Sequence, residues 1–248
     1  MVLILARFGG QPEKTGAYLY LLCYSILSSF PILLFFLSGD REETDSTSSL
    51  SGVWAFCITV MFLVKLPLYG LHIWLPKAHV EAPTTGSILL AGLLLKMGGW
   101  GLFRLASCGM GLLRRGVFLL GIAGIGMGGL LASFQTDSKR LVAYSSVGHM
   151  NFFCVILVDE TTYGKGVSIL MMFAHSLVSR LMFFLAGFLA HIISTRSIYY
   201  AGSIPVISVT MSLVMLIAVF ANFGTPPSIS FFAEVGFLAS IIGSFPNI

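Results

Sequence analysis

Long runs of apolar residues that leave no helix face polar are the feature that most constrains the fold. Val53–Val64, Val117–Phe134 and Val206–Phe223 approach, alone or with their flanks, the ~20 residues that cross a hydrocarbon core. A soluble chain would confine its apolar residues to one face of each element, with the period of a helix or strand. No such confinement is visible here, so the lipid bilayer is the expected solvent.

The composition supports this reading and removes several other classes of protein. Hydrophobic residues make up 56% of the 248 and charged residues only 10%, against about 25% charged in soluble domains. The net charge of +4 comes from scattered Lys and Arg without a basic stripe, which excludes a nucleic-acid partner. Strand-length alternation typical of a membrane β-barrel is absent. The predicted fold class is therefore all-α, a polytopic transmembrane helix bundle.

Polar stretches divide the chain into about eight hydrophobic segments. The stretches lie at 7–15, 38–50, 76–86, 107–116, 135–140, 159–165 and 194–204. The segments between them are predicted at 16–37, 51–75, 87–106, 116–134, 141–158, 164–193, 205–223 and 228–245. Residues 1–107 then form one unit with three membrane helices and the end of another, and residues 108–248 a second unit with four to five.

Lys65 lies in the middle of an apolar segment, too far from either end to reach the membrane surface. A charge at such a depth costs about 2.5–3.5 kcal/mol on insertion scales, so it needs a partner, water or a function. Pro67 lacks an amide donor and predicts a broken helix beside the lysine. Broken helices host ions and water in transporters. The alternative is a structural pair between Lys65 and an acid.

Two further ionisable residues repeat this pattern. Lys96 lies about nine residues into the following segment, and Glu234 follows a second predicted helix break at Pro226 and Pro227. A proton relay requires groups whose proton affinity responds to a neighbour's charge, and buried amines and carboxylates have this property. The repeated break also hints at the internal repeats of transporter folds. Structural ion pairs remain the alternative for both residues.

His149 and His175 are predicted relay members, because a neutral imidazole both donates and accepts a proton. Each could equally form a hydrogen bond between helices. Arg180 is expected to act as a counter-charge, since guanidinium stays protonated in proteins. A structural role is favoured for the three histidines nearer to segment ends, which are His72, His79 and His191.

Residue patterns typical of other kinds of functional site are not found in this sequence. The four cysteines are dispersed without metal-ligand spacing and are interpreted as small hydrophobic residues. Gly124–Gly129 matches the dinucleotide-binding pattern, but it lies in an apolar helix without a preceding strand. Gly124 and Gly128 instead predict close packing against another membrane helix. No metal site, cofactor site or nucleophile is expected in this chain.

Several stretches resemble the chain 4 family of NADH:ubiquinone oxidoreductase, respiratory complex I. They are VKLPLYGLHIWLPKAHVEAPTTGSILLAGLLLKMGGWGLFRL at Val64–Leu105, QTDSKRLVAYSSVGHM at Gln135–Met150, MMFAHSLVSRLMFF and PPSISFFAEVGF. LPKAHVEAP is the most specific, and its Lys77 resembles the mitochondrial form. The resemblance extends through nearly the whole chain.

The resemblance implies an antiporter-like subunit of two inverted repeats, each with a discontinuous helix. Such a subunit would span the mitochondrial inner membrane beside other membrane-arm subunits and move protons, while NAD and ubiquinone are used elsewhere in the complex. The family's hydrophilic axis matches Lys65, Lys96, His175 and Glu234. Arg180 stands where the family has a small polar residue.

The family's members are about twice as long as this chain. In the family, a glutamate that pairs with the broken-helix lysine lies on a helix whose last residues match Met1–Ala6, so this chain is expected to be a fragment that lacks the glutamate. Two other functions stay open: a stand-alone cation/proton antiporter subunit, and a structural membrane scaffold with paired buried charges.

Overall fold

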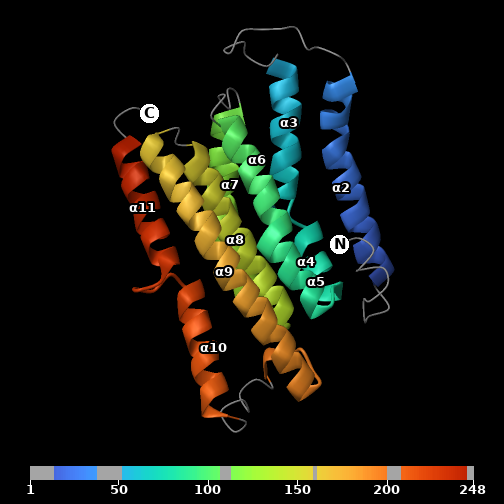
Figure 1. The fold of residues 1–248 in the computed structure, drawn as a ribbon, viewed down its shortest axis with the longest axis vertical. Helices are drawn as coiled ribbons and strands as arrows, with labels where there is room; N and C mark the ends of the chain where they lie inside the picture. Colours follow the sequence, from blue (N-terminus) through green and yellow to red (C-terminus); the bar gives the residue numbers. More distant parts are fainter. Residues whose placement is uncertain (1–13, 38–51, 107–112, 159–160, 200–207, 245–248) are drawn as a thin grey trace.

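Helices aligned along one long axis build almost all of the structure, which is a computed structural model describing residues 14–37, 52–106, 113–158, 161–199 and 208–244 (Figure 1). No strand occurs within these ranges, so the predicted all-α bundle is confirmed. The helices are α2 (Lys14–Leu37), α3 (Gly52–Lys65), α4 (Trp74–Glu81), α5 (Thr84–Leu89), η1 (Leu90–Leu94), α6 (Leu95–Ala106), α7 (Leu113–Ser133), α8 (Ser138–Val158), α9 (Thr162–Ile193), α10 (Val209–Asn222) and α11 (Ile229–Ser244). The predicted helix end at Met1–Ala6 lies outside the described residues.

Five helical stretches are long and apolar enough to cross a membrane. They are Thr15–Leu34, Thr84–Ala106, Leu113–Ser133, Ser138–Val158 and Thr162–Ile193. Large apolar side chains remain exposed along them, as at Leu27, Leu119 and Phe184. Exposure of this extent on every outer helix suits contact with lipid or with other membrane helices.

Two of the shorter apolar helices, α3 and α10, stop part-way along the bundle, and each is followed by a second short helix (Figure 1). The first helix leaves its axis after Lys65 and resumes as α4 at Trp74, and the second leaves after Asn222 and resumes as α11 at Ile229. The first interruption, residues 66–73, is called break 1, and the second, residues 223–228, is called break 2. Break 1 is mostly buried or half-buried, so its backbone polar groups need partners within the protein. At break 2 only Gly224 is buried, and Phe223, Pro226 and Pro227 are exposed.

The polar stretch predicted at 76–86 is not a simple loop. Residues 74–81 form α4, and its side chains are buried except for that of Lys77. The prediction of a loop was wrong because polar residues in this stretch are buried in the bundle and do not face water. His79 and Glu81 are buried, and the carbonyls of Val80 and Ala82 accept hydrogen bonds from cationic side chains of other segments.

The following membrane span changes its helical pitch part-way. Thr84–Leu89 and Leu95–Ala106 are α-helical, but Leu90–Leu94 between them are π-helical. Such π segments are rare, and they are frequent at functional sites. The wider turn lies immediately before Lys96 and was not predicted from the sequence.

α7 and α8 lie in close contact through the predicted glycine face. A Cβ atom on Gly124 would overlap the Asn151 side chain, and one on Gly128 would lie 3.0 Å from the Gly148 nitrogen. The prediction that these glycines pack against a membrane helix is confirmed. α8 is consequently the central helix, with 67% of its membrane-length window buried, against 17–44% in the other four.

Two apolar clusters fill the interior on either side of a polar layer. One is built around Phe153, Leu157 and Met171, and the other around Val147 and Phe183. On α8 the first cluster begins at Met150 and the second ends at Val147, so His149 falls between them. His149, one of the predicted relay residues, thus lies between the two apolar clusters.

Candidate functional site

The centre of the candidate site is a direct contact between Lys96 and His175. The Lys96 Nζ atom lies 2.8 Å from Nδ1 of His175 and donates a second hydrogen bond of 2.8 Å to the Ala91 carbonyl. Ala91 belongs to the π-helical segment η1, one wide turn before the lysine. The π-helical turn and α9 together satisfy an amine that would otherwise be costly in the membrane interior.

His149 continues this contact toward break 2. Its ring centroid lies 5.7 Å from that of His175, and its Nε2 atom lies 3.1 Å from the carbonyl oxygen of Asn222, where α10 ends. The second nitrogen of each ring, Nδ1 of His149 and Nε2 of His175, is buried without a hydrogen-bond partner among the described residues. Unsatisfied buried nitrogens in two neighbouring rings are uncommon in a purely structural pair.

A small cavity lies beside the two histidines. It has a volume of about 10 Å³, which is close to the smallest space that holds one water molecule. Its walls come from α8, α9 and the residues around break 2, namely His149, Met171, His175, Val178, Ala221, Asn222 and Ser230. His149 and His175, each with one unsatisfied nitrogen, therefore border space of the size that a bridging water needs.

Lys65 lies near this centre without joining it. It is the last residue of α3, and its Cβ is so close to Gly98 of α6 that any side chain there would press against it. Its Nζ atom lies 5.8 Å from the centroid of the Phe62 ring. Within the described residues, Lys65 makes no direct hydrogen bond or ion pair with Lys96 or the histidines.

Break 1 begins where the sequence predicts, next to Pro67, but other side chains hold it. The Trp74 indole nitrogen donates to the Val64 carbonyl at 3.1 Å. The Asn151 side chain donates to the Pro67 carbonyl at 3.1 Å and accepts from the Tyr69 amide at 3.3 Å. Asn151 was not predicted as a site residue, although a carboxamide among apolar residues of a membrane helix was the signal that could have revealed it.

Glu234 lies at break 2. Its carboxylate packs against Gly224, whose φ of +65° is in the left-handed region and which has no room for a Cβ atom. The break is closed by hydrogen bonds from Ser230 Oγ to the Ala221 carbonyl at 2.6 Å and from Thr225 Oγ1 to the Phe220 carbonyl at 3.0 Å. Among the described residues, Glu234 has no direct hydrogen bond or ion pair with His149.

The remaining predicted residues have different environments. Arg180 is exposed, its stem packs on Gly92 of η1, and its Nε donates to the Ser176 carbonyl at 2.8 Å. His72 accepts a hydrogen bond from the Gly70 amide, whereas His191 is exposed. His79 is fully buried on the ring of Phe183, and neither of its nitrogens has a hydrogen-bond partner in the described part of the chain.

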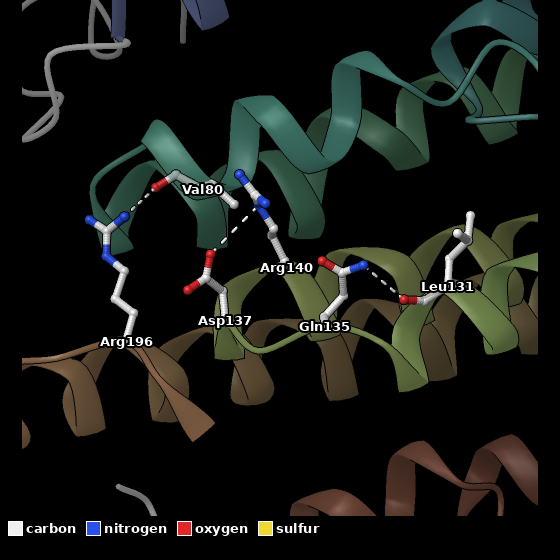
Figure 2. Close-up of polar contacts among 6 residues, drawn as sticks. All are labelled: Val80, Leu131, Gln135, Asp137, Arg140 and Arg196. Carbon is white, nitrogen blue, oxygen red and sulfur yellow. Dashed lines mark hydrogen bonds and ion pairs between the residues drawn. The ribbon is translucent and has the colours of Figure 1, made fainter. Parts of the chain in front are cut away.

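The end of α4 is held by two cations from distant segments. Lys139 is buried and donates to the Ala82 carbonyl at 2.9 Å. Arg196 donates to the Val80 carbonyl at 3.0 Å, as Figure 2 shows. Positive charge is favourable at a helix carboxyl end. Figure 2 also shows Arg140 paired with Asp137 at 3.6 Å, a contact that is half-exposed.

No group of three or more His, Cys, Asp or Glu side chains able to hold a metal ion occurs within the described ranges. The described residues that meet at the centre are amines, imidazoles and backbone carbonyls. The lysine amine and the imidazoles can take up and release protons, whereas the backbone carbonyls can only accept hydrogen bonds from them.

Comparison with known proteins gives concordant results. The chain is 41% identical over 244 residues to NADH-ubiquinone oxidoreductase chain 4 of Ascaris suum, covering 94% of this chain and 58% of that protein. It is 40% identical over 238 residues to the protein of the same name from Caenorhabditis elegans, with the same coverage. It spans a little over half the length of these relatives.

Among solved structures, a chain of respiratory complex I from Thermus thermophilus with bound NADH matches with a TM-score of 0.85 and 25% identity. The match covers 99% of this chain and 56% of that one. The family model for NADH:quinone oxidoreductase/Mrp antiporter transmembrane proteins matches residues 1–247. The chain therefore belongs to the NADH:quinone oxidoreductase/Mrp antiporter transmembrane family.

Proposed function

We propose that this chain is part of a proton-translocating subunit in the membrane arm of NADH:ubiquinone oxidoreductase, respiratory complex I, in the mitochondrial inner membrane. The names of the Ascaris and Caenorhabditis relatives and the likeness to the Thermus complex support this assignment. Its partners would be other membrane-arm subunits and the lipid bilayer. NADH and ubiquinone would be bound and converted elsewhere in the complex.

Protons would pass along the middle of the bundle, from Lys65 through Lys96, His175 and His149 to Glu234. The observation that carries this proposal is the 2.8 Å contact between Lys96 and His175, with His149 beside it. Water would complete the path, since the two unsatisfied imidazole nitrogens belong to residues that border the cavity. Lys65 and Glu234, at the two breaks, would need water to join the path.

Proton pumping by the intact complex in proteoliposomes tests the path. Lys96→Met removes the amine at the centre but keeps most of the side-chain volume, so the number of protons moved per electron should fall. Lys165→Met is the matched control, because this lysine lies in the first turn of α9, ten residues before His175. The control should keep the wild-type ratio.

The alternatives predict other outcomes. A stand-alone cation/proton antiporter would transport protons without co-purifying with quinone-reducing activity. A structural scaffold would keep an unchanged proton-to-electron ratio when Lys65 or Lys96 is replaced by an apolar residue, because a buried charge that only stabilises can be exchanged for apolar packing. An unchanged ratio in Lys96→Met would therefore refute the proposed path.

A further inference from the structure

Asn151 is a fully buried carboxamide at the centre of the bundle. Its side chain makes three hydrogen bonds: Nδ2 donates to Pro67 O at 3.1 Å and to Val147 O at 2.8 Å, and Oδ1 accepts from the Tyr69 amide at 3.3 Å. Two of these three contacts reach across to break 1. The third returns to the preceding turn of α8, so every polar atom of the side chain is engaged.

These hydrogen bonds replace the backbone hydrogen bonds that the helix loses at break 1. A regular helix pairs each carbonyl with an amide four residues later, and Pro67 ends this pattern after Lys65. Pro67 O and Tyr69 N are then a carbonyl and an amide facing the interior. A carboxamide is the side chain that offers one donor group and one acceptor in a single plane, so it matches both.

The packing of α7 restricts the carboxamide to this arrangement. An ideal Cβ on Gly124 would lie 2.4 Å from both Cγ and Oδ1 of Asn151. Only a glycine at this position allows the α7 backbone to lie directly against the amide group. The side chain is therefore enclosed by α7 on one side and by break 1 on the other.

His149 lies two residues earlier on the same helix, about 200° around its axis. Its Nε2 atom forms a hydrogen bond with the carbonyl of Asn222, the last residue of α10 before break 2. One short stretch of α8 thus contacts both interrupted helices, Asn151 at the first break and His149 at the second. The position of each break relative to the other is set through these two side chains.

We propose that Asn151 is a positioning residue for proton translocation, which fixes break 1, and with it Lys65, relative to His149 and break 2. The inference rests on the proposed function for its effect on pumping. Asn151 itself transfers no proton, because a carboxamide does not gain or lose a proton at ordinary pH. Its role is to keep the end of α3 at a fixed distance from the central path.

The test compares two variants in the intact complex that carries this chain. Asn151→Leu keeps the approximate volume and removes all three side-chain hydrogen bonds. Val155→Ala is the matched control, because Val155 lies one turn later on α8, is buried against Gly121, and has an apolar side chain that forms no hydrogen bond with break 1. In fully assembled complex, Asn151→Leu should lower the number of protons moved per electron toward the value of Lys65→Ala. Val155→Ala should leave this ratio unchanged.

A second readout does not depend on pumping. Amide hydrogen exchange over residues 66–73 should become faster in Asn151→Leu and stay unchanged in Val155→Ala, because only the first variant frees the Tyr69 amide. Gly124→Ala, which displaces the carboxamide without changing its chemistry, should reproduce both effects in part.

The outcomes separate this inference from the function on which it rests. If Lys65→Ala lowers the proton ratio but Asn151→Leu leaves the ratio and the exchange at wild-type values, only the positioning role is overturned. If Asn151→Leu accelerates exchange while neither variant changes the ratio, the proposed function fails and the structural contact stands. A fall in assembled complex with an unchanged ratio would assign Asn151 to stability alone.

Discussion

The two central ionisable residues, Lys96 and His149, are each paired with neutral groups. Lys96 has an imidazole and a π-helical carbonyl, and His149 has the carbonyl at the end of α10. These are neutral acceptors rather than carboxylates. A cation held by neutral acceptors can lose its proton without leaving an unpaired negative charge behind, which suits a transfer group better than a structural ion pair does.

Replacing His175 with leucine should affect both stability and transport. The change removes the acceptor 2.8 Å from Lys96 Nζ, and loss of one partner in a buried hydrogen bond costs about 1–3 kcal/mol. We expect less assembled complex at raised temperature on native gels and fewer protons moved per electron. His191→Leu on the same helix is exposed and should change neither. Normal pumping by assembled His175→Leu complex would exclude this imidazole from the path.

Two neighbouring cations at the start of α8 should differ sharply in importance. Lys139→Met removes a buried donor from the Ala82 carbonyl and should cost about 1–3 kcal/mol. Arg140→Met removes only the half-exposed pair with Asp137, and such pairs contribute about 0–1 kcal/mol. The midpoint of thermal inactivation of the complex should therefore fall for the first variant and barely move for the second. Equal shifts would contradict this reading of the α4 end.

At the scale of elements, α8 is the helix on which the others are arranged. It packs on the glycine face of α7, supplies His149 and Asn151 to the two breaks, and begins with the lysine that holds the end of α4. Its sequence alone reads as one more apolar span. What distinguishes it is that polar residues occur on several of its faces, which only a helix enclosed by protein can tolerate.

The glycine face gives a prediction with an internal control. Gly128→Ala places a methyl group 3.0 Å from the Gly148 nitrogen, and backbone cannot move aside as a side chain can, so overpacking of about 1–3 kcal/mol is expected. Gly129→Ala, the next residue, meets nothing within 4 Å. Assembly of the complex at raised temperature should fall in the first variant and not in the second. A tolerated Gly128→Ala would mean that α7 and α8 are further apart than the structure has them.

At the scale of the whole molecule, the two breaks form the ends of one arrangement with the Lys96, His175 and His149 contact between them. Lys65 is the last residue before break 1, and Glu234 lies in α11 with its carboxylate against Gly224 of break 2. If both residues serve one path, their replacements act on the same process, and the effects of residues that act as a unit are not additive.

This leads to a test with three variants of the intact complex. Lys65→Ala and Glu234→Gln should each lower the protons moved per electron, and the double variant should lower the ratio little further than the more severe single one. The measurement is the proton-to-electron ratio in proteoliposomes driven by NADH oxidation. Losses that add in the double variant would indicate two separate paths rather than one.

The amino-acid sequence alone predicts the membrane bundle, the position of break 1 beside Pro67, and the ionisable residues that lie among apolar ones. These follow from chain-local physics: segment length against bilayer thickness, the missing proline amide, and the cost of a charge at depth. It also predicted the packing role of Gly124 and Gly128, because a small-residue face is visible in spacing alone.

Which of these residues come into contact depends on how the helices pack. Lys96 and His175 are 79 positions apart and in contact, whereas Lys65 is closer in sequence to Lys96 and makes no hydrogen bond with it. The helical form of residues 74–81, the π-helical turn before Lys96 and the hold of Asn151 on break 1 were likewise absent from the sequence pattern. The hydropathy pattern of the sequence indicates where burying a polar group is costly. The partner that offsets this cost is supplied by the packing of helices that are distant in the sequence.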